Sequence, residues 1–265
     1  MPVESLVNPM FQHETWLKTL IPVFQAARRY HNHEVKGLEH VPEGTGATLV
    51  FNHSLATYDI SLMLAALYME RGVAARTILD RLFFKVPLLG NFMENYLGAI
   101  QGRRDIAEQL LKQKEIVAVA PGGMFEALRP STQRYQIKWE HRLGFVHVAM
   151  KTKTPVILAA CPKADELYDV LPLNITSFFY EKYKLPVFLA AGRGLSPIPK
   201  PVQLTHYLSE PMMPPKWTRN EAERDRRARV FHGQLVDKMN ELMCSGIRDP
   251  RRSGKDYSRR RGMPG

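Results

Sequence analysis

The chain has few cysteines and no long apolar run. Its 265 residues include only two cysteines, Cys161 and Cys244. Neither lies in a CxxC motif or a Cys/His cluster, so we expect no disulfide framework and a reducing compartment. The most apolar stretch, Ile60–Met69, is about half the ~20 residues that a membrane-spanning helix needs. The first residues have no basic segment ahead of an apolar one, so we also expect no secretory signal.

Several catalytic and binding motifs are also absent from the sequence. It has no GxSxG, which disfavours a serine hydrolase, and no GK[ST] phosphate loop. His31 and His33 lack the spacing of an HExxH or Cys/His site, so we expect no metal and no bound cofactor. No helix-turn-helix, zinc-finger or RNA-binding signature accompanies the net charge of +11, so nucleic acid is not the expected partner.

The positive charge is concentrated near the end of the chain. Arg248–Arg261 contains seven Lys or Arg residues against two Asp, with almost no apolar side chain. Such a composition predicts a basic, disordered tail over residues 247–265. It fits a purely solubilising tail or one attracted to an anionic membrane surface.

Short apolar runs alternate with amphipathic segments along the chain. The pattern predicts strands at 47–51, 75–79, 115–120, 155–160 and 186–190, an edge strand at 202–208, and helices at 57–71, 81–96, 104–114, 140–151 and 219–243. This alternation is typical of an α/β fold with a mostly parallel (mixed) central sheet flanked by helices. Sites in such folds collect where the carboxyl ends of strands open into loops.

Residues 12–30 predict a separate N-terminal amphipathic helix. Its apolar stripe, Trp16–Phe24, is followed by Arg28 and Arg29. An apolar stripe with cationic flanks suits a helix lying in a membrane interface. Packing of the same stripe on the domain's own core is the alternative.

A histidine and an aspartate follow the first central strand. The strand 47–51 delivers His53 to its carboxyl end, and the next helix carries Asp59 in its first turn. A carboxylate that orients an imidazole is the arrangement that general-base catalysis requires. Taken alone, the pair also fits a polar loop histidine and an aspartate that complements the helix dipole.

Two further segments carry glycine and charge. Pro121-Gly122-Gly123 follows a strand, and Glu126 and Arg129 come shortly afterwards on one helical face. The backbone of such a turn can approach an anion, although most turns of this kind are ordinary. Upstream, Arg104 and Asp105 open a helix after a glycine, where arginine suits a phosphate but is often only solvated.

The order of these segments resembles the lysophospholipid acyltransferase (PlsC-like) superfamily, over residues 35–162. The proline-glycine-glycine motif is similar to that of its diacylglycerol acyltransferase and phytyl-ester-synthase-like branch. Five residues separate His53 and Asp59, as in that branch, but Ser54 and Thr57 stand where it commonly has glycine and proline. The resemblance implies an acyltransferase domain over 33–246, between an N-terminal helix (1–32) and the tail.

The resemblance also implies the roles of the site residues. His53 would be the general base and Asp59 its orienting partner. Acceptor binding would fall to a set of residues in the two later segments: Arg104, Asp105, Gly122, Gly123, Glu126 and Arg129. An apolar set downstream of the second strand suits either an acyl-chain pocket or ordinary core: Phe83, Phe84, Leu88 and Leu89.

The implied reaction is transfer of a fatty acyl group, other than an aminoacyl group, from acyl-CoA or acyl carrier protein to a lipid hydroxyl. Amides near Gly122 or Gly123 would stabilise the oxyanion. The expected partners are the acyl donor, a glycerolipid or related alcohol, and a membrane surface to which a cytoplasmic protein attaches peripherally. Two alternatives are a hydrolase of acyl esters or thioesters and a non-catalytic lipid-surface binding protein of the same fold.

Overall fold

The computed structural model describes residues 10–79, 99–171 and 190–247. In chain order the longer elements are α1 (Met10–Tyr30), β1 (Glu34–Lys36), β2 (Ala47–Phe51), α2 (Tyr58–Arg71), β3 (Ala75–Leu79), β4 (Ile100–Gln101), α4 (Arg104–Lys112), β5 (Ile116–Val119), α5 (Gly123–Ala127), α6 (Gly144–Thr152), β6 (Val156–Ala160), β7 (Asp169–Val170), β8 (Ala190–Ala191), β9 (Thr205–Leu208) and α8 (Glu221–Ile247). Short 3-10 turns occupy Leu38–His40, Leu55–Thr57, Ser131–Gln133, Pro162–Glu166 and Arg193–Leu195.

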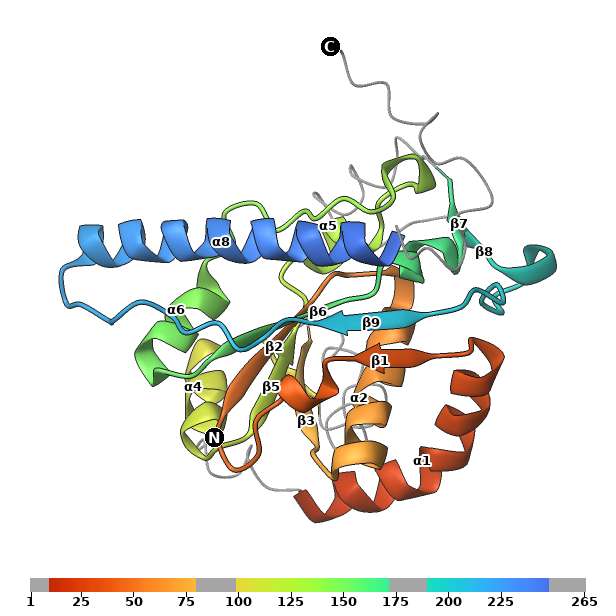
Figure 1. The fold of residues 1–265 in the computed structure, drawn as a ribbon, viewed down its shortest axis with the longest axis horizontal. Coiled ribbons are helices and arrows are strands. Elements are labelled where there is room, and N and C mark those ends of the chain that lie inside the picture. The colour runs from red at the N-terminus through yellow and green to blue at the C-terminus, as the bar shows by residue number, and fades with distance from the viewer. Residues whose placement is uncertain (1–9, 80–98, 172–189, 248–265) are drawn as a thin grey trace, which may run out of the picture.

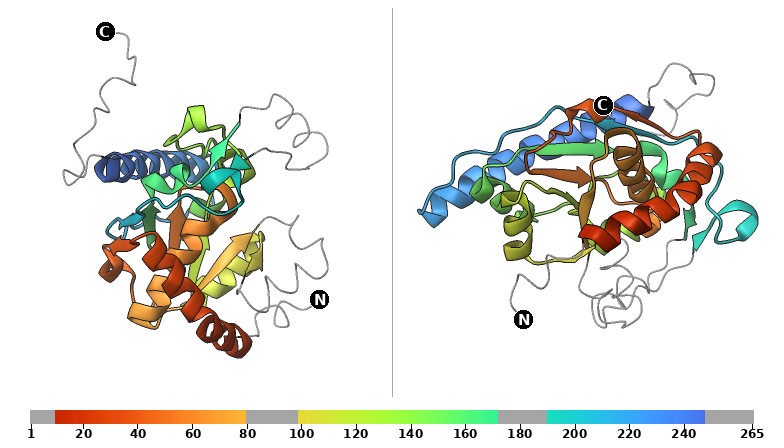
Figure 2. Two further views of the ribbon diagram at one scale, coloured as in Figure 1. Left: turned by 90° about the vertical axis from the view of Figure 1, so that its right-hand side faces the viewer. Right: turned by 90° about the horizontal axis from the view of Figure 1, so that it is seen from below.

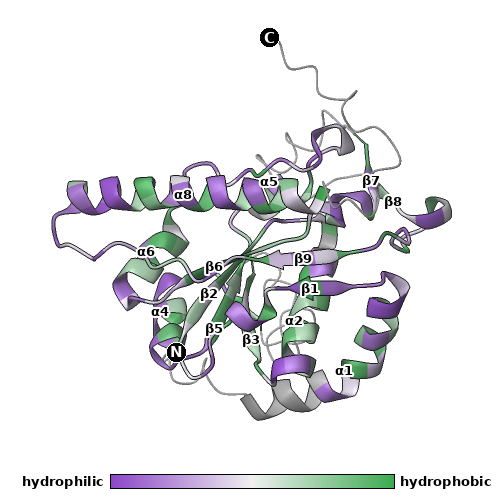
Figure 3. Ribbon diagram, viewed as in Figure 1, coloured by the Kyte–Doolittle hydropathy of each residue, from purple (hydrophilic) through white to green (hydrophobic). Residues whose placement is uncertain are grey.

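Seven strands form one sheet, in the order β1-β9-β6-β2-β5-β3-β4 (Figure 1). Every neighbouring pair is parallel except β6 and β9, which run antiparallel. The sheet is therefore mixed but mostly parallel, which confirms the predicted fold class. The central strands β2, β5 and β6 appear as the most apolar part of the molecule in Figure 3.

Alternate side chains of the central strands support two separate cores. Leu49 and Phe51 of β2 pack with α2, whereas Val50 faces α6 and α8. Helix α4 packs beside α6, and α1 packs against α2. Helices therefore cover both faces of the sheet, as the two turned views also show (Figure 2). This double cover explains why the strand sequences are apolar on both sides.

The second half of α1 packs on the domain itself. Phe24 and Ala27 contact a buried cluster that includes Leu62 of α2 and Leu204. Val23 on the same helix is 61% exposed. In the described part of the chain, no helix combines the length and apolarity needed to cross a membrane.

Strand β9 lies inside the sheet, so the prediction of an edge strand at 202–208 was wrong. Short β1 pairs with its outer side, with Val35 opposite His206. β1 is only three residues long, with Val35 between the charged Glu34 and Lys36, so it has too little apolar pattern to be recognised from sequence. The helix predicted at 140–151 begins later than expected, since α6 starts at Gly144.

Some predictions concern residues outside those described. They are the helix at 81–96 with the pocket residues Phe83, Phe84, Leu88 and Leu89, most of the strand at 186–190, and the tail after residue 247.

Candidate active site

Asn52 joins the carboxyl ends of the two central strands. The residue is buried directly after β2, and its amide group pairs with the backbone of Cys161 at the end of β6. Its Oδ1 accepts from the Cys161 amide at 2.8 Å, and its Nδ2 donates to the Cys161 carbonyl at 3.3 Å. The Cys161 amide would otherwise be buried without a partner, whereas the Cys161 carbonyl also accepts from the Ala164 amide at 3.1 Å. Asn52 therefore holds the loop that carries the next residue, His53.

His53 is partly exposed, with one ring nitrogen anchored and the other unpaired. Its Nδ1 lies 2.8 Å from the carbonyl oxygen of Ser54. A carbonyl oxygen can only accept, so Nδ1 carries the proton and Nε2 keeps its lone pair. Among the described residues, none forms a hydrogen bond with that Nε2. The ring is therefore held as a neutral base.

Asp59 is fully buried behind this ring, at the start of α2. Its Oδ1 accepts a short hydrogen bond from the Ser54 hydroxyl, and its Oδ2 has no hydrogen-bond partner. Oδ2 lies 3.7 Å from Nε2 of His206 in β9. The sequence placed Asp59 in direct contact with His53. In the structure Ser54 stands between them, since its hydroxyl faces the aspartate and its carbonyl faces the histidine.

The loop that brings Asp59 to this position has a left-handed residue. Thr57 precedes α2 with φ at 53°. Proline, with φ fixed near about −65°, cannot adopt this conformation. The conformation of Thr57 is therefore one that the proline expected from the resemblance could not adopt.

Burial lowers the pKa of His53 below the ordinary value. The Ser54 carbonyl and the Asp59 charge act in the opposite direction, while Arg129 and Arg142 lower the pKa further. His53 is therefore neutral at pH 7, the state in which a histidine accepts a proton.

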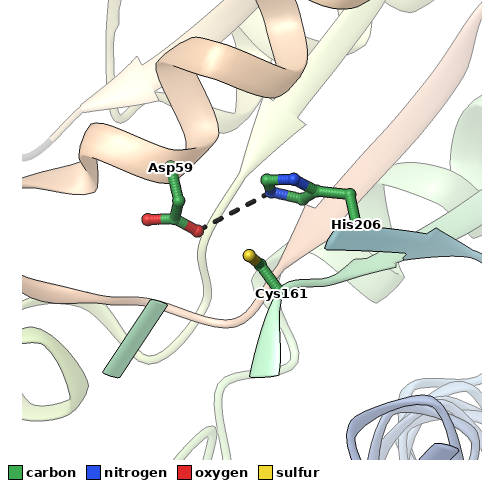
Figure 4. A group of neighbouring side chains, drawn as sticks. All are labelled: Asp59, Cys161 and His206. Carbon is green, nitrogen blue, oxygen red and sulfur yellow. Dashed lines mark ion pairs between the residues drawn. The ribbon is translucent and has the colours of Figure 1, made fainter. Parts of the chain in front are cut away.

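Asp59, Cys161 and His206 form a second buried group, drawn in Figure 4. Their donor atoms all lie within 4.8 Å of one another, and the residue types are those that bind zinc. Burial raises the pKa of the Cys161 thiol well above its ordinary value, so the thiol is neutral in this structure. Within the group, Oδ2 of Asp59 and Nε2 of His206 lie 3.7 Å apart.

The proline-glycine-glycine turn packs around a buried glutamate. A Cβ on Gly122 would lie 1.6 Å from Oε2 of Glu126. Gly123 has a φ of 51° and forms a turn in which its amide donates to the Ala120 carbonyl at 3.1 Å. That amide is consequently not free for an oxyanion. Burial raises the pKa of Glu126 to about 7, opposed by Arg129.

Arg129 is buried, and two of its three nitrogens are in use. Nη1 donates to the His53 carbonyl at 2.9 Å and to the Glu126 carbonyl at 2.8 Å, and Nη2 pairs with Asp165, whereas Nε has no hydrogen-bond partner. Glu126 is 0% and Arg129 6% exposed, and Arg129 lines a small pocket together with Ser131 and Asp165. Both shape the loop that carries His53.

Arg142 supplies the accessible positive charge at this edge. It is partly exposed, donates to the Pro121 carbonyl at 2.7 Å and lies over the Phe125 ring at 5.6 Å. Its charge lowers the pKa of His53, so its field reaches the ring. Sequence analysis did not identify Arg142 as a site residue, since it lies in a polar loop about twenty residues after the turn.

Arg104 and Asp105 lie on the exposed side of α4. Asp105 is ion-paired with its neighbour Arg103, and the guanidinium of Arg104 is about 3.5 Å from where a Cβ on Gly144 would be. Neither residue contributes to the pKa of His53 or Glu126. Arg104 therefore lies beside the start of α6, and Asp105 beside Arg103. Neither residue takes part in the contacts that hold His53.

Comparisons with known proteins identify a family and several relatives. The profile of the family described as "Acyltransferase" matches residues 32–161, which span β1 to β6 and include His53, Asp59 and Glu126. The human protein named "DGAT1/2-independent enzyme synthesizing storage lipids" is 29% identical over 214 residues, which cover 79% of this chain and 64% of the human protein. The chicken protein of that name is 31% identical over 186 residues, covering 70% of this chain and 53% of its own length.

A solved structure shares the fold. The chain superposes on the 1-acyl-sn-glycerophosphate acyltransferase PlsC of Thermotoga maritima with a TM-score of 0.52 and 18% identity, over 84% of this chain and 79% of that one. The chain spans less than two thirds of the human and chicken relatives above. Residues 32–161 of this chain therefore match the acyltransferase family, and the chain shares its fold with the PlsC structure.

Proposed function

We propose that the protein transfers a fatty acyl group from an acyl thioester to the hydroxyl of a glycerolipid or a related lipid alcohol. The observation that carries the proposal is the state of His53. Its Nδ1 is tied to the Ser54 carbonyl at 2.8 Å, so its Nε2 keeps the lone pair, and none of the described residues forms a hydrogen bond with that nitrogen. Family membership supports the class of reaction, and the names of the human and chicken relatives support a lipid product.

The chemistry follows from that ring. Nε2 of His53 takes the hydroxyl proton as the acceptor oxygen attacks the thioester carbonyl carbon. The tetrahedral intermediate then collapses with cleavage of the carbon–sulfur bond, and the imidazolium returns the proton to the departing sulfur. General-base action of this kind contributes roughly 10²–10⁴-fold, so positioning of the substrates must supply the rest.

The buried carboxylate stabilises the imidazolium without touching it. Asp59 raises the pKa of His53, and so favours the protonated ring that forms in the transition state. The hydroxyl of Ser54, bonded to Asp59, fixes the peptide whose carbonyl orients the ring. Asp59 is a positioning and electrostatic residue in this scheme.

Arg142 is the side chain that we assign to the anionic part of a substrate. It is accessible, cationic and close enough to His53 to affect its pKa. A lysophospholipid acceptor carries its phosphate close to the hydroxyl that is acylated, and a guanidinium binds phosphate well. Arg142 donates to the Pro121 carbonyl and so lies against the turn that contains Gly122 and Gly123.

An acceptor panel tests the proposal. Purified protein is incubated with radiolabelled acyl-CoA and, in separate reactions, diacylglycerol, a lysophospholipid, a long-chain alcohol, or no acceptor. We expect an acylated lipid with at least one acceptor and little free fatty acid. Free fatty acid formed equally in every reaction would favour the hydrolase. Lipid binding without turnover in any reaction would favour the non-catalytic alternative.

A further inference from the structure

A chain of polar contacts runs from the molecular surface to Asp59. It begins at Arg28 of α1, whose Nη2 donates to Glu70 of α2 at 2.7 Å. Nε of Arg28 donates to Nδ1 of His33 at 3.1 Å. Nε2 of His33 lies 2.9 Å from Nδ1 of His206, whose Nε2 faces the Asp59 carboxylate at 3.7 Å. Both histidines are buried, at 8% and 0% exposure.

The first donor sets the direction of every later contact. A guanidinium has no acceptor, so Nδ1 of His33 must accept. Burial lowers the pKa of His33 to about 2, so this ring is neutral and has its single proton on Nε2. That proton is donated to Nδ1 of His206, which therefore accepts as well. A neutral His206 then carries its proton on Nε2, which faces Asp59.

We propose that Arg28, His33 and His206 are positioning residues for the active site, which act by presenting an N–H to Oδ2 of Asp59. That oxygen is buried and accepts no hydrogen bond, and Nε2 of His206 is the cationic or N–H group that faces it, at 3.7 Å. With one oxygen facing His206 and the other held by Ser54, Asp59 remains an acceptor only, and the Ser54 peptide keeps the orientation that ties down His53. The catalytic consequence rests on the proposed function, whereas the proton positions do not.

This series of polar contacts starts and ends at the same helix, α2. Arg28 is tied to Glu70 near the end of α2, and the chain returns to Asp59 at the beginning of the same helix. His33 and His206 come together because β1 pairs with β9, which places Val35 opposite His206. The contact between Arg28 and His33 therefore links α1, the sheet edge and α2. This arrangement gives α1 a role in the active site as well as in packing.

Other titratable groups near the chain do not alter its direction. His31 is the further group that affects the pKa of His33, and its Nδ1 is 2.8 Å from the Val202 carbonyl. Cys161 lies beside Asp59 as a neutral thiol, since burial raises its pKa. Arg129 and Arg142 lower the pKa of His53, whereas the charged groups that lower the pKa of His33 are His206, Arg28 and His31.

Proton positions are measured directly by long-range ¹H–¹⁵N spectra of the labelled protein. The wild type should show His33 and His206 as neutral rings with the proton on Nε2, and His53 with the proton on Nδ1. A doubly protonated His206, or one with its proton on Nδ1, would overturn the proposal. This measurement needs no substrate, so it decides the proposal even if the protein proves to have no acyltransferase activity.

Two variants test the consequence for catalysis. Arg28→Leu removes the first donor, and Arg29→Leu, at the exposed neighbour, is the matched control. His206→Leu removes the N–H that faces Asp59, whereas His206→Gln keeps an amide N–H at a similar reach. At 3.7 Å the N–H faces the buried carboxylate as an electrostatic contact, weaker than a hydrogen bond to a charged group, and its loss corresponds to about a tenfold effect.

We expect kcat to fall about tenfold in Arg28→Leu and His206→Leu, with KM unchanged, and to stay within about threefold in the control and in His206→Gln. The His206 proton should move in Arg28→Leu and not in Arg29→Leu. Equal kcat in Arg28→Leu and its control, with folded spectra for both, would contradict the proposal. So would a His206→Gln variant as slow as His206→Leu.

Discussion

The stability of a Glu126→Gln variant, measured relative to the wild type, should increase as the pH rises. Glu126 is fully buried, and neither of its carboxylate oxygens has a hydrogen-bond partner in the described structure. Its nearest cation, Nη1 of Arg129, is 3.6 Å away. Desolvation outweighs this attraction and raises its pKa from 4.5 to about 7. In the unfolded chain the carboxyl has its ordinary pKa.

The sign follows from proton binding. Between pH 4.5 and about 7, Glu126 is ionised in the unfolded chain and protonated in the folded one. The native state then binds more protons, so the free energy of unfolding of the wild type falls as the pH rises. Glutamine does not titrate. The stability of Glu126→Gln relative to the wild type should therefore increase by on the order of 3 kcal/mol across this window and level off above it.

Urea unfolding of both proteins at pH 4, 5, 6, 7 and 8 measures this difference. Other groups that titrate in both proteins cancel in the comparison. Glu39→Gln, at an exposed glutamate, controls for the loss of a carboxyl. A difference that stays flat with pH, or one in which the wild type gains on the variant as the pH rises, would refute the assignment of Glu126 as a desolvated carboxyl.

Three further results are expected. Asn52→Leu should destabilise the fold by ~1–3 kcal/mol in urea unfolding, because it leaves the Cys161 amide at the end of β6 buried without a partner. Gly122→Ala should unfold at least ~1–3 kcal/mol more easily, because its Cβ would lie 2.4 Å from the Cβ of Glu126; Gly233→Ala, with open space around its Cβ, should be neutral or stabilising. The acidic limb of kcat/KM should titrate below pH 6.5, because burial lowers the pKa of His53, and a limb above that pH would contradict this.

The sequence predicted the part of the site that is local in the chain. An apolar run bounded by glycines identified β2, and the next helix followed from its own pattern, so the placement of His53 and Asp59 at one strand end could be foreseen. The sequence could not show that Ser54 lies between them in place of a direct bond, because this depends on the conformation of one peptide. The backbone before α2 turns the hydroxyl of Ser54 to the aspartate and its carbonyl to the histidine.

The rest of the site depends on contacts between distant residues. His206 reaches Asp59 only because β9 enters the sheet between β1 and β6, and β1 is too short to be predicted. For the same reason β9 was mistaken for an edge strand. Arg129 is a further example, since its ion pair with Asp165 joins residues that are distant in the sequence and could not be predicted from it.

The central claim is that Nε2 of His53 removes the proton from the acceptor hydroxyl. Its most direct test is the rate of acyl transfer by His53→Ala at pH 7.5, with the acceptor that serves the wild type best and with circular dichroism to verify the fold. Removing a general base predicts a fall in kcat of about 10²–10⁴-fold. A folded His53→Ala variant that transfers the acyl group within a few-fold of the wild-type rate would contradict the account.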